Sequence, residues 1–187
     1  MGTFSLEELN RAQEKAYSLL KNRKYLESSN IFESLLEQGV VGAAVQLGYI
    51  FSQRENPQFD LDKAISYFEI AAENKDLYAQ YALGALLEKC GRRDEALRWY
   101  SEASNLGHPT CSFLAFRELN ARGDTEAAGE FFRKALDQGS PAAIQRHAIE
   151  RMKGRFGWSA VVPGLIEYIG NMPRMARFIK NEVSLRW

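Results

Sequence analysis

The feature that most constrains the fold of this chain is a unit that recurs four times and ends each time in a turn. The turns fall at residues 39, 75, 107 and 139, so they are 36, 32 and 32 residues apart. A pair of bulky side chains precedes each turn at a constant offset: Ile31-Phe32, Tyr67-Phe68, Trp99-Tyr100 and Phe131-Phe132. Self-similarity at such a period predicts a stacked repeat architecture.

Small residues recur in the other half of each unit. Four residues after the turns stand Ala43, Ala79, Cys111 and Ala143. Five residues further on stand Gly48, Gly84, Phe116 and Ala148. Residues four or five apart share one face of a helix, and small ones let a neighbouring helix approach closely. Each unit is therefore predicted to be a helix hairpin that buries its apolar face only by stacking on the next.

The punctuation by glycine, proline and capping residues predicts where each helix begins and ends. We expect repeat helices over 5–21, 24–38, 40–53, 60–74, 76–90, 93–106, 109–121, 124–138 and 141–153. After Gly154 the pattern degenerates, and we expect two capping helices over 159–170 and 173–185. Ala64, Ala96 and Ala128 are expected to be buried where helices cross.

The pattern resembles the SEL-one-like repeat, a relative of the tetratricopeptide repeat, over roughly residues 8–153. The matching residues are 79–84 (AQYALG) in a first helix, and Asp60, Lys63-Ala64, Tyr67-Phe68 and Ala71-Ala72 in a second. The Gly-His-Pro of 107–109 and the Gly-Ser-Pro of 139–141 fit the inter-repeat turn. The resemblance implies an α-superhelical adaptor that binds other proteins and has no catalysis of its own.

We therefore expect an all-α fold, a right-handed α-α superhelix (solenoid) of about four to five helix hairpins with a C-terminal capping helical segment. The 187 residues are expected to form a single domain, with repeats over 5–153 and degenerate capping helices over 154–187.

Few residues offer catalytic or metal-binding chemistry. His108 is expected in a turn and His147 on a packing face, and a structural role is favoured over a metal or catalytic pair for both. Cys111 falls on a small-residue position, which favours a buried structural thiol, and Cys90 has no second pair for zinc. We expect no cofactor, no metal site and no enzymatic activity.

Charge and targeting signals restrict the partner and the location. The formal net charge is zero, so the chain lacks the basic footprint of a nucleic-acid-binding protein. The first residues do not have the pattern of a secretory signal peptide. The sequence contains no stretch of 18 apolar residues, so no transmembrane helix is predicted. With only two cysteines, a cytoplasmic location is predicted, whereas the oligomeric state is left open.

A protein or peptide partner is predicted to bind in the concave groove of the repeats, which the first helix of each hairpin lines. The proposed partner-binding residues are Tyr17, Tyr49, Tyr78, Tyr81, Phe113, Arg117 and Ile149, with Val45 in the same lining. Tyrosine and arginine are frequent interface anchors. Two alternatives stay open: that these side chains are core, and that the chain's own helix over 173–185 fills the groove.

A second hypothesis uses the basic C-terminal end as a membrane-surface or enzyme-docking patch. Residues 1–150 carry 17 Lys+Arg and 22 Asp+Glu, whereas residues 151–187 carry seven and two. The patch would comprise Arg155, Phe156, Trp158, Arg174, Arg177 and Lys180. Basic and aromatic residues on an amphipathic helix suit an anionic membrane. The competing interpretation, which the sequence favours, is a capping helix whose charges are solvated.

Overall fold

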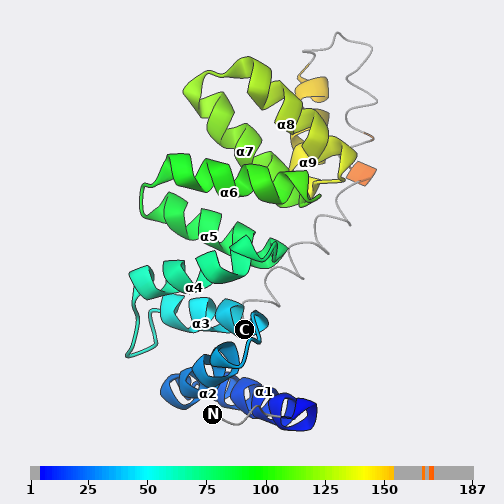
Figure 1. Ribbon diagram of the computed structural model, residues 1–187. Coiled ribbons are helices and arrows are strands. Elements are labelled where there is room, and N and C mark those ends of the chain that lie inside the picture. Colours follow the sequence, from blue (N-terminus) through cyan, green and yellow to red (C-terminus); the bar gives the residue numbers. More distant parts are fainter. Residues whose placement is uncertain (1–4, 154–165, 167–168, 171–187) are drawn as a thin grey trace. The chain divides into compact units, whose positions relative to one another are not determined.

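A computed structural model describes residues 5–153 together with residues 166, 169 and 170. Over 5–153 the chain forms nine helices and no strand (Figure 1). The helices are α1 (Leu6–Lys21), α2 (Tyr25–Glu37), α3 (Gly42–Ser52), α4 (Leu61–Glu73), α5 (Leu77–Lys89), α6 (Arg93–Asn105), α7 (Pro109–Arg122), α8 (Thr125–Asp137) and α9 (Pro141–Met152). The nine repeat helices expected from the sequence are thus confirmed, with ends that differ by at most two residues.

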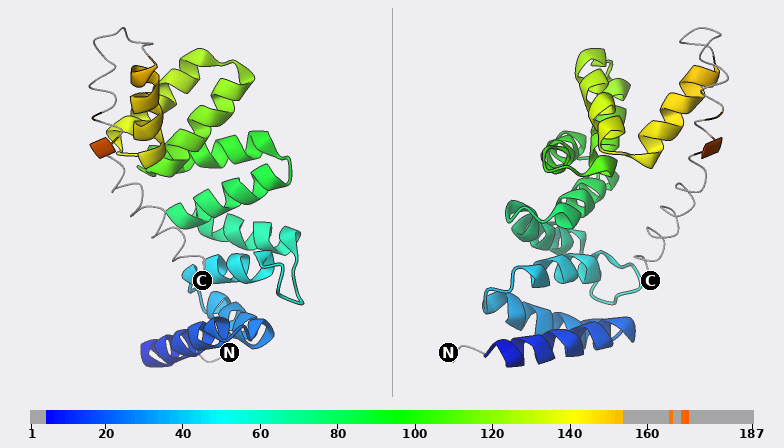
Figure 2. Two further views of the ribbon diagram at one scale, coloured as in Figure 1. Left: turned by 180° about the vertical axis from the view of Figure 1, so that it is seen from behind. Right: turned by 90° about the vertical axis from the view of Figure 1, so that its right-hand side faces the viewer.

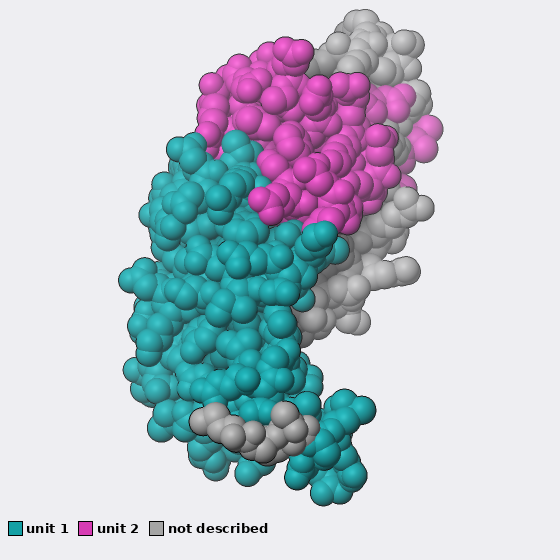
Figure 3. Space-filling view, in the orientation of Figure 1, with its two compact units in different colours: residues 1–99 teal, residues 100–187 magenta. Residues whose placement is uncertain are grey.

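The chain divides into two compact units, residues 1–99 and residues 100–187, which Figure 3 colours separately. In unit 1 each helix from α1 to α4 contacts the next along the chain. In unit 2, α7 contacts α8, and α9 contacts both. Figure 2 shows the antiparallel course of consecutive helices in both units. This sequential packing of helix hairpins is an α-α solenoid pattern, as the repeat predicts.

Each turn between two hairpins contains one residue with a left-handed backbone conformation. The predicted turn residues Gly39, Lys75, Gly107 and Gly139 all have positive φ, between 63° and 95°. At Gly107 the φ of 95° is one that L side chains rarely adopt, so glycine serves there. Lys75 takes φ 63°, inside the small left-handed region that other residues can enter at some cost. The turn positions expected from the sequence are confirmed.

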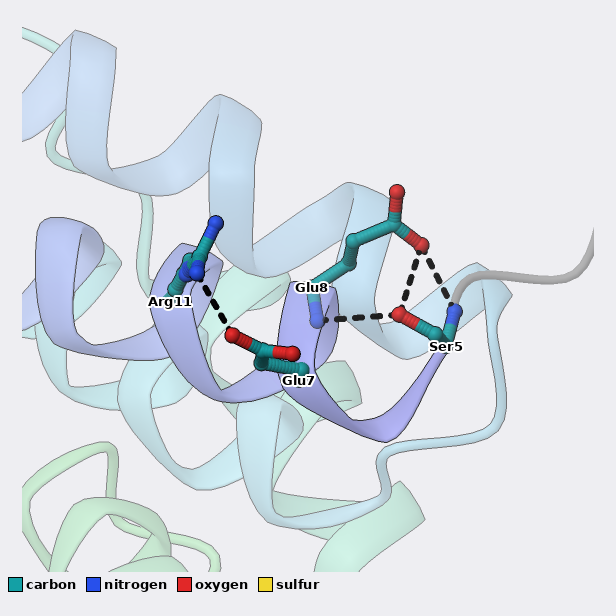
Figure 4. Close-up of polar contacts among 4 residues, drawn as sticks. All are labelled: Ser5, Glu7, Glu8 and Arg11. Carbon is teal, nitrogen blue, oxygen red and sulfur yellow. Dashed lines mark hydrogen bonds and ion pairs between the residues drawn. The ribbon is translucent and has the colours of Figure 1, made fainter.

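Side-chain caps begin most of the helices. At α1, Ser5 Oγ accepts from the Glu8 N–H at 3.3 Å, and the Ser5 N–H donates to Glu8 Oε2 at 2.7 Å (Figure 4). This reciprocal capping box satisfies two backbone donors and lowers the pKa of the Glu8 carboxyl. The carboxylates of Asp60, Asp76 and Asp124 cap α4, α5 and α8 by accepting a single backbone N–H each. By contrast α3 begins at Gly42 without a side-chain cap.

Small residues at repeated positions form the core. The alanines expected at helix crossings, Ala64, Ala96 and Ala128, are all buried, as predicted. So are the small residues that follow the turns: Ala43, Ala79, Cys111 and Ala143. A buried polar side chain joins the two helices of the first hairpin, because Ser28 Oγ on α2 donates to the carbonyl of Ala16 on α1 at 2.9 Å. Each hydrogen bond removes the desolvation cost that a buried hydroxyl would otherwise carry.

The longest loop within residues 5–153 lies between α3 and α4, where the sequence places the extra residues of the longer period. Asn56 is buried at its centre and donates from Nδ2 to the carbonyl of Ile50 at 2.9 Å. Its Oδ1 accepts from the N–H of Gln58 at 3.0 Å. Asn56 therefore holds the loop against the end of α3. The loop lengthens this repeat, while α3 and α4 remain packed as a hairpin.

Candidate protein-binding surface

The first-helix face is the name used here for the side of α1, α3 and α5 in unit 1, and of α7 and α9 in unit 2, that carries the predicted partner-binding residues. Where a helix carries two of these residues they are three or four positions apart, so they lie on one side of it. The two units carry different chemistry on this face.

In unit 1 the first-helix face is tyrosine-rich and partly open to solvent. Tyr17 and Tyr78 are each 42% exposed, whereas Tyr49 and Tyr81 are half-buried. The ring of Tyr17 stands edge-on to that of Phe32, with centroids 5.4 Å apart. Burial raises the pKa of Tyr49, and the nearby Tyr25 and Glu55 add to the effect. These four tyrosine side chains are therefore partly covered by the protein and partly exposed to solvent.

Val45 behaves differently from its tyrosine neighbours. Only 9% of it is exposed, so it belongs to the core although it shares the helix side. It forms part of the wall of a hollow of about 360 Å³ in unit 1, which the sequence did not predict. The hollow is lined by Val41, Gly42, Val45, Ala71, Asn74, Lys75 and Asp76. It brings the uncapped start of α3 beside the turn between α4 and α5.

In unit 2 the first-helix face combines an aromatic side chain with a cation. Phe113 is half-buried, and its ring lies 5.5 Å from that of Phe116. Arg117, one helical turn beyond Phe113, is exposed, and Ile149 on α9 is half-buried. The predicted residues of this unit thus lie on helices that contact each other, α7 and α9.

The contact between Arg146 and Phe116 in this region was not predicted from the sequence. The guanidinium of Arg146 lies over the ring of Phe116, with Cζ 4.9 Å from the centroid. Phe116 in turn packs against Phe132 at 4.8 Å, and His147 stands edge-on to Phe132 at 6.4 Å. The sequence does contain a signal for this contact. Arg146 is a charged residue at the position that Ala82 and Leu114, both apolar, occupy in the two preceding repeats.

Two of the remaining candidates for chemistry, His108 and Cys111, have structural roles. His108 caps α7, because its Nδ1 accepts from the N–H of Cys111 at 3.3 Å. Cys111 is buried, as predicted, whereas Cys90 is exposed at the end of α5. Within the described residues, no group of three or more His, Cys, Asp and Glu side chains is placed to hold a metal ion. In that same part of the chain, no helix is long and apolar enough to cross a membrane.

The second predicted patch, with Arg155, Phe156, Trp158, Arg174, Arg177 and Lys180, lies outside the described residues. The same holds for the expected helix over 173–185 and for most of the one over 159–170. Of the latter, residues 166, 169 and 170 are described and are helical.

No family model and no curated protein matches the sequence. Solved structures do match. A Sel1 repeat protein from Oxalobacter formigenes superposes with a TM-score of 0.69 at 20% identity, over 87% of this chain and 70% of that one. The chain has the SEL-one-like helical-repeat fold. A protective antigen of uropathogenic Escherichia coli with an SLR fold superposes with a TM-score of 0.66 at 17% identity. The match covers 87% of this chain and 38% of the antigen. MamA superposes at 0.61 and 13% identity, over 87% of this chain and 96% of MamA.

The SEL-one-like fold confirms the resemblance drawn from 79–84 and from the turn sequences. At these identities the likeness concerns the fold and not a shared partner.

Proposed function

We propose that this SEL-one-like chain is a non-catalytic, cytoplasmic adaptor or scaffold that binds a protein partner on the first-helix face, the side expected to be concave in such repeats. The observation that carries the proposal is the set of aromatic side chains there that are neither core nor fully solvated. Tyr17 and Tyr78 are 42% exposed, and Tyr49, Tyr81 and Phe113 are half-buried.

Such side chains are well suited to bind protein. An aromatic ring that is already held by its own helix loses little conformational freedom when a partner covers its open face. Tyr17 is held in this way by Phe32, and Phe113 by Phe116. A tyrosine also keeps a hydroxyl for a hydrogen bond at the rim. The hollow beside Val45 could receive an apolar side chain of the partner, because Val41, Val45 and Ala71 form its apolar wall.

The test is capture of a partner by variants of the two faces. The chain is used as bait in extracts of its source cell, the captured protein is identified by mass spectrometry, and its affinity is measured with purified components. Tyr81→Ala combined with Phe113→Ala should abolish capture and leave the helical content intact. The matched control, Tyr67→Ala with Phe131→Ala, removes half-buried aromatics from the second helices and should retain capture.

Thermal melting decides between surface and core. If the Tyr81→Ala, Phe113→Ala variant melts at a sharply lower temperature and captures partner only in proportion to its folded fraction, these side chains are core and the proposal is wrong.

The alternative function, docking of the basic segment 151–187 on a membrane or an enzyme, is supported by its seven Lys+Arg against two Asp+Glu. Flotation with anionic liposomes tests it. Binding that disappears on deletion of 173–187 would support membrane docking, and absence of the intact chain from the floating fraction would exclude docking on such a membrane.

A further inference from the structure

Arg146 stands out among the cations of unit 2. It is exposed on α9, and its guanidinium lies over the face of Phe116. Within the described residues this ring is its partner, and neither a carboxylate nor a hydrogen-bond acceptor engages it. The aromatic face fixes the guanidinium plane without using its N–H donors. Arg146 therefore offers a pre-positioned set of five donors to an incoming acceptor.

The nearby acidic side chains are engaged by their own cations. Glu118 on α7 accepts from Nε and Nη2 of Arg122, each at 3.0 Å. Glu150, one turn beyond Arg146, has its Oε1 3.9 Å from Nζ of Lys153. Arg117 adds a second exposed guanidinium on α7. The exposed charged side chains of α7 and α9 are thus arginines, although the chain as a whole is neutral.

An apolar side chain lies next to these cations. Phe113 is half-buried and packs against Phe116, the ring that carries Arg146. Arg117 follows Phe113 by one helical turn and shares its side of α7. A ligand that covered Phe113 with an apolar group would therefore bring a neighbouring carboxylate within the neighbourhood of both arginines.

We propose that the surface of unit 2 formed by Phe113, Arg117 and Arg146, around the buried ring of Phe116, binds an acidic peptide segment of the partner, with glutamate or aspartate side chains interspersed with large apolar ones. This inference rests on the proposed function and names the partner's chemistry. Arginine forms charge-assisted, bidentate hydrogen bonds with a carboxylate, and its weak hydration lowers the cost of burying the pair. The apolar contact with Phe113 supplies affinity, and the arginines set the register.

The probe is a fluorescein-labelled synthetic peptide of alternating glutamate and leucine, with a glutamine–leucine peptide as its neutral match. Fluorescence anisotropy with the intact chain at low salt should show binding of the glutamate peptide at least about tenfold tighter than that of the glutamine peptide, and the difference should shrink as salt rises. Equal affinity for the two peptides, or no binding of the glutamate peptide, would overturn the proposal.

Variants localise the site. Arg146→Gln should weaken binding of the glutamate peptide about tenfold, as expected for loss of a hydrogen bond to a charged group. Arg133→Gln, an exposed arginine on α8 of the same unit, is the matched control and should leave the affinity unchanged. Circular dichroism confirms that both variants are folded. An equal loss in both variants would show general charge attraction and overturn the assignment to Arg146.

Two further results separate this inference from the proposed function. If a protein partner is captured through Tyr81 and Phe113 but Arg146→Gln binds it normally, the acidic segment is wrong and the adaptor function stands. If a single-stranded oligothymidylate binds the same surface more tightly than the glutamate peptide at equal salt, the ligand is a nucleic acid and the inference fails.

Discussion

Gly48 on α3 lies directly against the ring of Phe68 on α4: a Cβ added at Gly48 would stand 2.7 Å from both Cγ and Cδ1 of that ring. Phe68 is buried, so the ring has little room to move away. In unit 2 the same two positions hold Phe116 and Phe132, whose rings meet at 4.8 Å. The same repeat position thus has two uses. In unit 1, Gly48 lets α3 and α4 approach closely, and in unit 2, Phe116 provides the ring that the Arg146 guanidinium contacts.

Replacement of Gly48 by alanine should therefore destabilise the protein. Alanine normally stabilises a helix interior relative to glycine by about 0.5–1 kcal/mol, but overpacking against Phe68 should cost about 1–3 kcal/mol. Gly129→Ala on α8 is the matched control, because its added Cβ would meet nothing within 4 Å. Urea denaturation should show a loss for Gly48→Ala and a gain for Gly129→Ala. A gain in both would refute the close contact.

Ala96 tests the register of the repeat. It is buried at the position that Ala64 and Ala128 occupy in the neighbouring repeats. Ala96→Leu should overpack the interior and lower the free energy of unfolding by about 1–3 kcal/mol. Ala121→Leu, at an exposed position on α7, should be close to neutral. A melting temperature of Ala96→Leu equal to that of the parent would show that the register is wrong.

Gly107 tests the turn geometry apart from packing. Its φ is 95°, and an added Cβ would meet nothing within 4 Å, so any cost of Gly107→Ala comes from the backbone alone. We expect a loss of stability of about 1–2 kcal/mol. Gly42→Ala, also uncrowded but without a positive φ, should be neutral or stabilising. Equal effects on the denaturation midpoint would contradict a left-handed turn at Gly107.

Tyr67 provides a prediction about alkaline pH. Its hydroxyl donates to Glu33 Oε1 at 3.1 Å, and burial, the Glu33 charge and this hydrogen bond raise its pKa above 10.0. Because the folded-state pKa exceeds the unfolded one, the resulting stabilisation is present below about pH 10 and is lost as the pH rises through the folded-state pKa. Glu33→Gln should move the Tyr67 titration, followed by NMR, to lower pH. An unchanged titration would show that Glu33 does not act on Tyr67.

The helices and turns could be predicted from the sequence because their signals are local. Asp60, Asp76 and Asp124 mark helix starts, and Gly107 and Gly139 mark turns, through interactions within a few residues. Burial of the small residues followed from the repeat itself, because equivalent positions in stacked hairpins have equivalent neighbours.

The candidate surface was less predictable because it depends on how far each side chain extends beyond its neighbours. Val45 and Tyr81 occupy equivalent repeat positions, yet Val45 is buried and Tyr81 is half-exposed, since the longer tyrosine reaches past the helix contact. The stacking of Arg146 on Phe116 joins two helices and departs from the consensus of the repeat at both residues. The hollow beside Val45 likewise arises from the approach of α3 to the turn after α4.

The most direct test of the adaptor proposal is site-specific photo-crosslinking in the source cell with benzoyl-phenylalanine. Phe113 on α7 and Phe131 on α8 are both half-buried phenylalanines of unit 2, on a first and a second helix respectively. The first-helix face predicts that the analogue at 113 forms a covalent adduct with a partner protein, whereas the analogue at 131 forms none. An adduct at 131 without one at 113 would contradict it.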